Sequence, residues 1–231
     1  MSTLTGTFLI NNVAVALKDT NNLRWPRTEL LSWLNEAQRA IVLIQPVANP
    51  IVLSVQMVPG ARQTLPSDGY LLLDIYRNMG TTPGTTPGPS VKPISKQLLD
   101  AYNPTWDAAA NQATAIQNFM YSVKDRLAYY VYPPSDGTGF IEISYAQLPA
   151  PLSAEANTIT LPDIFDSAIE NYMLWRACMK DAEFAPGLML GREYMQAFQL
   201  LVGGEKTGVE KDSAAQGMSG VNQPQNPGGK V

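Results

Sequence analysis

The sequence contains no histidine and a single cysteine, Cys178, among its 231 residues. Without histidine, the chain lacks the commonest general base and a frequent zinc and iron ligand. One cysteine excludes an intrachain disulfide, and its place inside a helical pattern indicates a small buried apolar side chain rather than a reactive thiol. We therefore expect no catalytic residue, no metal site and no cofactor.

Charged residues are also scarce: they make up 16% of the chain, against 45% hydrophobic residues, and the net charge is −4. The Lys and Arg residues form no cluster. Tight binding to nucleic acid requires several cations that displace phosphate counterions, so we expect no specific binding of DNA or RNA. A surface with few charges is often covered by partners or by copies of the same chain.

No long apolar run interrupts the sequence. No segment approaches the roughly 18 consecutive apolar residues of a membrane-spanning helix, and no basic stretch followed by an apolar one begins the chain. We expect a protein made in the cytoplasm, without a signal peptide and without a membrane partner.

Helical periodicity is strongest near the two ends of the chain. Residues 5–18 form a plausible amphipathic helix, and a second helix follows Arg24-Trp25-Pro26, with either Pro26 in its first turn or Thr28 as its cap, and ends before Pro46. Residues 161–183 carry apolar and aromatic side chains at three- and four-residue spacing. Ala185-Pro186-Gly187 is expected to stop this helix, and residues 188–202 to form another.

The segment between the helical patterns has a different texture. Apolar runs rich in β-branched residues alternate with turn sequences, which predicts strands. In residues 140–145 apolar and polar side chains alternate, as in a half-buried strand. Expected strands cover residues 51–58, 61–65, 70–79 (helix being the alternative for its start), 91–94, 119–123, 126–132 and 140–146, with a short helix at 96–102. Pro59-Gly60 is expected to turn the first strand back into the second, and residues 133–139 to close a hairpin between the last two.

These patterns predict an α+β fold. Neither helical pair can bury its apolar face alone, so residues 1–50 and 150–202 should form one four-helix bundle with an antiparallel β-rich insertion at residues 51–149. Residues 203–231 are rich in glycine and polar residues and cannot bury enough apolar surface to offset their ordering. We expect an extended C-terminal tail that is disordered unless a partner holds it.

Two groups of acidic residues are weaker candidates for a chemical role. Asp163, Asp166 and Glu170 could hold a cation, although acids at a helix start usually complement its dipole. Asp74 and Glu142 could serve as paired carboxylates of a hydrolase, but nothing in the sequence brings them together.

The tyrosines beside Pro133-Pro134 could form a surface that stacks on sugars. The simpler interpretation is that they belong to the core side of a strand. Trp25, Trp33 and Trp175 fit the helical core, whereas Trp106 follows a turn and is the tryptophan expected to face a partner. The expected contact surface of the insertion comprises Trp106, Tyr132, Pro133 and Pro134.

Six segments form a recognisable pattern: Arg24-Trp25-Pro26, Leu30 to Arg39, Pro59 to Pro66, Leu73 to Asn78, Tyr130 to Pro134 and Asp166 to Ala177. Together they resemble the head-to-tail adaptor (connector) proteins of tailed bacteriophages. The similar pattern spans about residues 4–202 and leaves the last residues uncovered.

The resemblance implies a structural virion protein rather than an enzyme. It implies a homo-oligomeric ring, typically of twelve copies, docked under the portal protein, joined to a tail or nozzle protein and surrounding a channel that passes DNA without binding it. The C-terminal extension would reach the portal, with Val209, Met218, Val221 and Val231 as apolar anchors, and the β-rich insertion would face the tail. A tail-associated carbohydrate-binding module and, less favoured, a carboxylate-based hydrolase are the alternatives.

Overall fold

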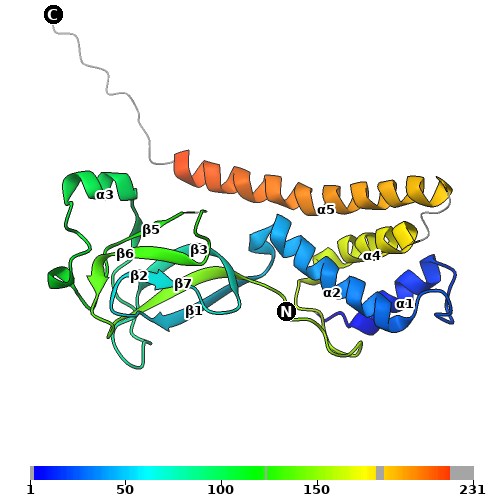
Figure 1. Cartoon of the computed structure of the whole chain (residues 1–231), viewed down its shortest axis with the longest axis horizontal. Helices are drawn as coiled ribbons and strands as arrows, with labels where there is room; N and C mark the ends of the chain where they lie inside the picture. The colour runs from blue at the N-terminus through cyan, green and yellow to red at the C-terminus, as the bar shows by residue number, and fades with distance from the viewer. Residues whose placement is uncertain (1–2, 123, 181–184, 219–231) are drawn as a thin grey trace, which may run out of the picture.

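A computed structural model describes residues 3–122, 124–180 and 185–218, with the side chains of the last helix described from Gly187 to Gly203. The fold is α+β: the described residues form five α-helices and two sheets (Figure 1). The strands lie between Pro50 and Gln147, together with the short helix α3, Lys96–Tyr102. The sheets occupy one end of the molecule and helices α1, α2 and α4 the other (Figure 1).

The N-terminal helices begin at recognisable caps. Helix α1 spans Gly6–Ala16, and the Thr5 hydroxyl accepts a hydrogen bond from the backbone N–H of Phe8. Helix α2 spans Arg27–Ile44 after Pro26, whose fixed backbone angle suits a helix entry. Both predicted helices are therefore present, with Pro26 rather than Thr28 at the second start.

The C-terminal helices differ from the prediction at their boundary. A short 3₁₀ turn, Asp163–Phe165, leads into α4, Asp166–Lys180, and α5 spans Ala185–Met218. The prediction that Ala185-Pro186-Gly187 ends a helix is wrong: these residues begin α5. Proline is tolerated in a first helical turn because its missing N–H would have no partner there.

The end of α5 also corrects the prediction of an extended tail from residue 203. The helix continues through Gly203 to Met218, so that segment is helical, and residues 219–231 lie outside the described residues. The composition argument neglected that adding residues to an existing helix avoids the cost of nucleation. Glu, Lys, Ala and Gln between the glycines are good helix formers.

One hydrophobic core joins both ends of the chain. It contains Leu9 of α1, Leu34 and Ile41 of α2, Ile169 of α4 and Phe198 of α5, each at most 2% exposed. Trp25 and Trp33 belong to it, and Cys178 is buried beside it, as predicted. Trp175, also predicted for this core, is half-buried and lies outside it. The expected partnership between helices from opposite ends of the sequence is thus present in the packing.

The seven strands form a 3-stranded sheet, order β1-β7-β3, and a 4-stranded sheet, order β2-β6-β5-β4. All pairings are antiparallel except that of β4 with β5. A second core between the sheets contains Ile75, Val131, Ile141, Ile143 and Tyr145. The strand bounds are β1 Pro50–Gln56, β2 Gly60–Thr64, β3 Gly69–Asn78, β4 Lys92–Pro93, β5 Asn118–Tyr121, β6 Ala128–Ser135 and β7 Phe140–Gln147.

Both predicted hairpins are wrong. Strand β1 pairs with β7 and β2 with β6, so β1 and β2 lie in different sheets, and so do β6 and β7. Strand β6 also continues through Pro133 and Pro134 to Ser135, where a loop was expected. Proline lacks an N–H but still accepts: the Pro134 carbonyl accepts from the Ala113 N–H at 2.8 Å, and a bulge in β2 beside the strand end relaxes the pairing.

Candidate functional site

The acidic residues considered for chemistry are engaged in structural contacts. Glu142 forms an ion pair with Arg77 at 3.3 Å, and the Asp74 carboxylate accepts from the Ile75 backbone N–H. Asp163 accepts two hydrogen bonds from Thr3, whereas Glu170 accepts from Asn12. Across the described ranges, no three acidic or cysteine side chains are arranged to hold a metal ion.

The tyrosines of β6 serve the core of the sheet region. Tyr129 is 2% exposed, and burial raises the pKa of its hydroxyl. Tyr130 packs edge-on against Trp106, with ring centroids 6.4 Å apart, and Tyr132 is half-buried beside the same cluster. The strand therefore offers no open row of rings for stacking on a sugar.

Trp106 is buried, at 3% exposure, so the prediction that it faces a partner is wrong. Its indole N–H donates to the Asp100 carboxylate at 2.8 Å, and Lys96 donates to the same carboxylate. These hydrogen bonds hold the turn that contains Trp106 against helix α3. A turn residue can be buried when a nearby helix supplies an acceptor, and that tertiary contact leaves no signal in the sequence.

Helix α3 presents two large side chains that the sequence analysis did not select. Leu98 is 61% exposed and Tyr102 is 90% exposed. Their four-residue spacing places them on one side of the helix, opposite Asp100 and its network. That spacing is the signal that could have identified α3, rather than Trp106, as the exposed surface of the insertion.

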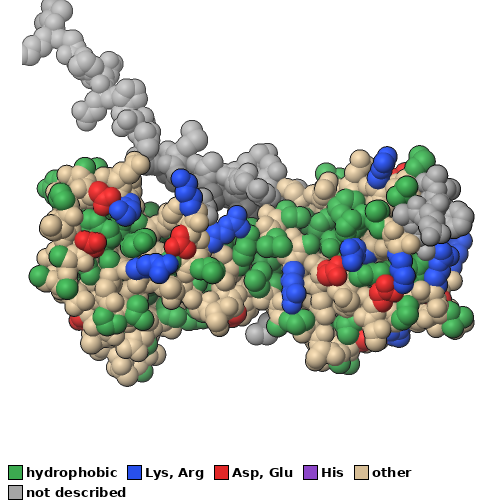
Figure 2. Space-filling model, in the orientation of Figure 1, with side chains coloured by type: hydrophobic (Ala, Val, Ile, Leu, Met, Phe, Trp, Pro, Cys, Tyr) green, Lys and Arg blue, Asp and Glu red, His purple; other side chains and the backbone are tan. Residues whose placement is uncertain are grey.

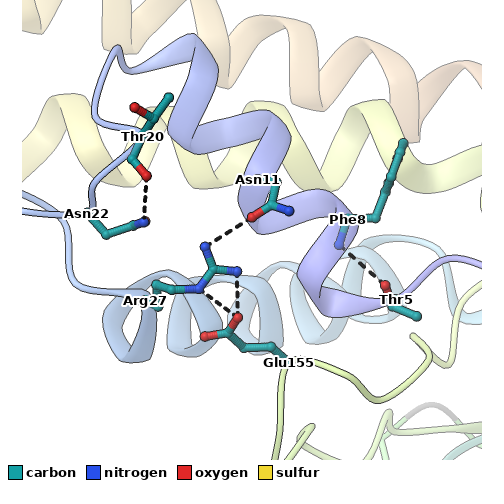
Figure 3. Close-up of polar contacts among 7 residues, drawn as sticks. All are labelled: Thr5, Phe8, Asn11, Thr20, Asn22, Arg27 and Glu155. Atoms are coloured by element: carbon teal, nitrogen blue, oxygen red, sulfur yellow. Dashed lines mark hydrogen bonds and ion pairs between the residues drawn. The ribbon is translucent and has the colours of Figure 1, made fainter.

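Figure 3 shows the contact that ties α1, α2 and the segment before α4 together. The Arg27 guanidinium donates to the Asn11 side-chain oxygen at 3.0 Å and pairs with Glu155 at 2.6 Å. The Glu155 carbonyl accepts from the Thr7 N–H at 2.7 Å, and a side chain on Gly6 would approach that carbonyl to 2.9 Å. Glycine at position 6 therefore permits the close approach that joins the chain ends.

Amide side chains fix the passage between helices and sheets. Asn35 on α2 donates to the Leu152 carbonyl at 3.2 Å and accepts from its N–H at 2.8 Å. Gln38 accepts from the Thr160 N–H at 2.9 Å, and Asn49 donates to the Gln147 carbonyl at the same distance. These hydrogen bonds between uncharged groups fix the chain where it passes from α2 into β1 and from β7 back toward α4.

The loop between α1 and α2 is held by one carboxylate. Asp19 accepts from the backbone N–H groups of Leu23, Arg24 and Trp25 at 3.0, 2.9 and 3.0 Å. These bonds, that from Trp25 above all, hold the pKa of Asp19 below its ordinary value. Leu23 is 85% exposed on this fixed loop.

The lowered pKa of Asp19 predicts an acid-dependent opening of this loop. A carboxyl whose pKa is lower in the folded state stabilises it above the unfolded pKa and loses that effect as pH falls through the folded value. The protection factors of the Leu23, Arg24 and Trp25 amides, meaning the exchange rate of the unfolded chain divided by the measured rate at the same pH, should therefore stay high near neutral pH and fall below the ordinary Asp range. The same acid step in an Asp19→Asn protein would contradict this origin.

The comparison with known protein families decides the identity. The family described as SU10 adaptor protein matches residues 5–224. The chain belongs to this family of phage head-to-tail adaptors. The resemblance seen in the sequence is confirmed, and the match covers nearly the whole chain. No curated protein matches.

Membership in the SU10 adaptor family makes this chain a phage structural protein. In the part of the chain that the structure describes, no helix has the length and apolarity needed to cross a membrane. On the face drawn in Figure 2, Lys and Arg side chains are interspersed with Asp and Glu.

The residues predicted to anchor the tail fall in different places. Val209 and Met218 lie on the distal half of α5, where side chains are not described, and Val221 and Val231 lie outside the described residues. Figure 1 shows α5 running beyond the other helices toward the sheet end of the molecule. Their contact with a portal protein stays a prediction.

Proposed function

We propose that this adaptor joins the portal of a tailed phage to the tail, as one subunit of a closed ring around the path of the DNA. The observation that carries the proposal is the family match over residues 5–224. The helices from both chain ends serve as its scaffold, a four-helix bundle of α1, α2, α4 and the first half of α5. The ring has typically twelve copies in the proteins that the sequence resembles.

The two ends of the molecule suit different partners. The distal half of α5, with Val209 and Met218, continues past the shared core and is assigned to the portal, together with Val221 and Val231. The sheet end, with the exposed Leu98 and Tyr102 of α3 and the half-buried Tyr132 and Pro133 of β6, is assigned to the tail or nozzle protein. Pro134, also predicted for this surface, is buried and is not part of it. Large exposed apolar and aromatic side chains are common anchors of protein interfaces.

The charge distribution suits a passive DNA channel. The net charge is −4, and cations form no cluster in the sequence. Phosphates bind tightly only where several cations gather, so a channel of mixed or negative charge lets DNA pass. The ring would therefore retain or release the genome mechanically, without a specific DNA contact.

Truncation tests the assignment of α5. A chain ending after Gly203 keeps Phe198 and Val202, the α5 residues of the shared core. Its thermal unfolding midpoint should equal that of the full chain, while its affinity for the purified portal protein of the same phage should fall at least about tenfold, or about 1.4 kcal/mol. Binding can be measured by biolayer interferometry. Equal affinity of the two chains would refute the portal role of this segment.

A further inference from the structure

Strand β1 lies at one edge of its sheet, and its outer side carries a row of backbone hydrogen-bonding groups. The Met57 N–H donates to the Gly139 carbonyl at 3.0 Å, in the same unshifted register that joins β1 to β7. Bonding positions alternate along an antiparallel pair, so the odd-numbered residues of β1 bond to β7. The backbone N–H and C=O groups of Val52, Ser54 and Gln56 therefore point outward.

These outer groups have no backbone partner in the part of the chain that the structure describes. The side chains of Ser54 and Gln56 donate to the carbonyls of Gly84 and Gly137, at 2.8 and 2.9 Å, but neither bond involves the backbone of β1. In Figure 1, β1 lies along the side of the sheet region that faces away from α3 and α5. Val52 is 52% exposed. The edge is therefore accessible to another chain.

The other edge strands carry features that normally prevent pairing with a further strand. Strand β2 has five residues, a bulge and the charged Arg62, and β4 has two residues, one of them Pro93. Strand β3 has three register shifts, and its second half is bonded to residues 89–91. Strand β1 has seven residues, no charge and no register shift, and its proline stands at the first position. Among the described strands, β1 thus keeps an edge suited to strand addition.

The core between the sheets is also incompletely covered at β1. Ile51, Leu53 and Val55 pack against this core but are only partly buried. Their pairing partners on β7, which is the central strand, are at most 1% exposed. A further strand with an apolar side chain at every second position would cover the inner face of β1 and remove its apolar surface from water.

We propose that β1 accepts, as an additional strand, an extended and uncharged segment of the tail or nozzle protein. The backbone of that segment bonds to the outer groups of β1, and its alternate apolar side chains cover the inner face of β1. Main-chain bonds supply the affinity in this mode of recognition, and the alternate side chains supply the specificity. The inference rests on the proposed function and names the contact by which the sheet region holds the tail.

A second copy of this chain does not suit the edge equally well. No other described strand keeps a regular, uncharged edge, so β1 of one copy could pair only with β1 of another. Two identical antiparallel strands are related by a two-fold axis, and that contact closes a dimer rather than a ring. The sequence 219–231 is also unsuitable, because Pro224 and Pro227 differ in parity and a strand containing both would turn one proline, without its N–H, toward the edge.

Amide hydrogen exchange tests the strand addition on the unmodified protein. Tailed particles are compared with tailless particles that carry the adaptor, using mass spectrometry with fragmentation that resolves single residues. Protection factors at Val52, Ser54 and Gln56 should rise at least about tenfold when the tail is present, whereas Leu53 and Val55, bonded to β7, should be protected in both. No rise at the outer positions would overturn the strand addition. Equal protection in tailless particles would overturn the tail protein as its occupant.

A matched pair of substitutions at position 52 forms the second arm. Val52→Pro removes one outward N–H and leaves the bonds to β7 in place, whereas Val52→Thr keeps the N–H and a branched side chain of similar size. At equal adaptor content, particles with Val52→Pro should carry at least about tenfold less tail protein, and particles with Val52→Thr should match the wild type. If Val52→Pro fails to fold or to enter particles, the exchange measurement decides.

The outcomes separate this contact from the function on which it rests. Particles with Val52→Pro that carry the full amount of tail protein would overturn the strand addition and leave the adaptor role intact. A wild-type chain that is absent from particles would refute the adaptor role itself. A purified chain that dimerises, and becomes monomeric with Val52→Pro, would identify a second copy as the occupant and overturn the assignment to the tail protein.

Discussion

Replacing Asn78 with alanine is expected to destabilise the sheet region severely. Asn78 is 3% exposed, and its side chain donates to the Ile116 carbonyl at 2.8 Å and to the Pro89 carbonyl at 3.0 Å. The same side chain accepts from the Ile116 N–H at 2.8 Å. Alanine leaves the buried N–H and carbonyl groups of Ile116 without that partner, at a cost of about 1–3 kcal/mol for each unsatisfied group. The Pro89 carbonyl still accepts from the backbone N–H of residue 78 at 2.9 Å. The free energy of unfolding should therefore fall by about 3 kcal/mol or more.

Urea unfolding followed by tryptophan fluorescence measures this loss, and Asn111 supplies the matched control. The Asn111 side chain donates to the Thr105 carbonyl at 3.0 Å but is exposed to solvent. Water can replace that bond, so Asn111→Ala should change the free energy of unfolding by less than about 0.5 kcal/mol. A loss for Asn78→Ala as small as that for Asn111→Ala would show that the buried bonds of Asn78 contribute little to the stability of the sheet region.

Replacing Phe198 with alanine should produce a comparable loss in the helical region. The ring is 2% exposed and packs edge-on against Tyr172 of α4, with centroids 5.3 Å apart. Because this ring is part of the core that α5 shares with α1, α2 and α4, truncation leaves a cavity in that core. Phe→Ala substitutions in cores cost about 3–5 kcal/mol.

The control lies two residues away on the same helix. Leu200 is 76% exposed, so Leu200→Ala removes a similar apolar side chain without opening a cavity. Differential scanning calorimetry should show a large drop of the unfolding midpoint for Phe198→Ala and a small change for Leu200→Ala. A small change for both would mean that α5 contributes little to the shared core.

The helices could be predicted because their signal is local. In α2 and α4 the apolar side chains recur every three or four residues. That repeat indicates a helix and also identifies which face of the helix is buried. Leu34 and Ile169, for example, stand on the predicted face and are fully buried. Opposite chain ends then had to share a core, because neither helix pair could bury its own apolar side.

The strand pairing could not be predicted, for the opposite reason. Alternation in β7 shows which side chains face the core, but it does not state that Val52 lies opposite Ser144, some ninety residues away. The same limit explains Trp106, whose burial depends on Asp100 and Tyr130 from separate elements.

The passage between helices and sheets is fixed by neutral amides, Asn35, Gln38 and Asn49, rather than by ion pairs. Dissolved ions screen charges, and acid removes them from carboxylates, but neither changes an amide hydrogen bond directly. The angle between the helical region and the sheet region should thus stay the same in concentrated salt or mild acid. Any reorientation of the halves in the virion would have to originate elsewhere, in the bending of β1 and β7 or of the long α5 rod.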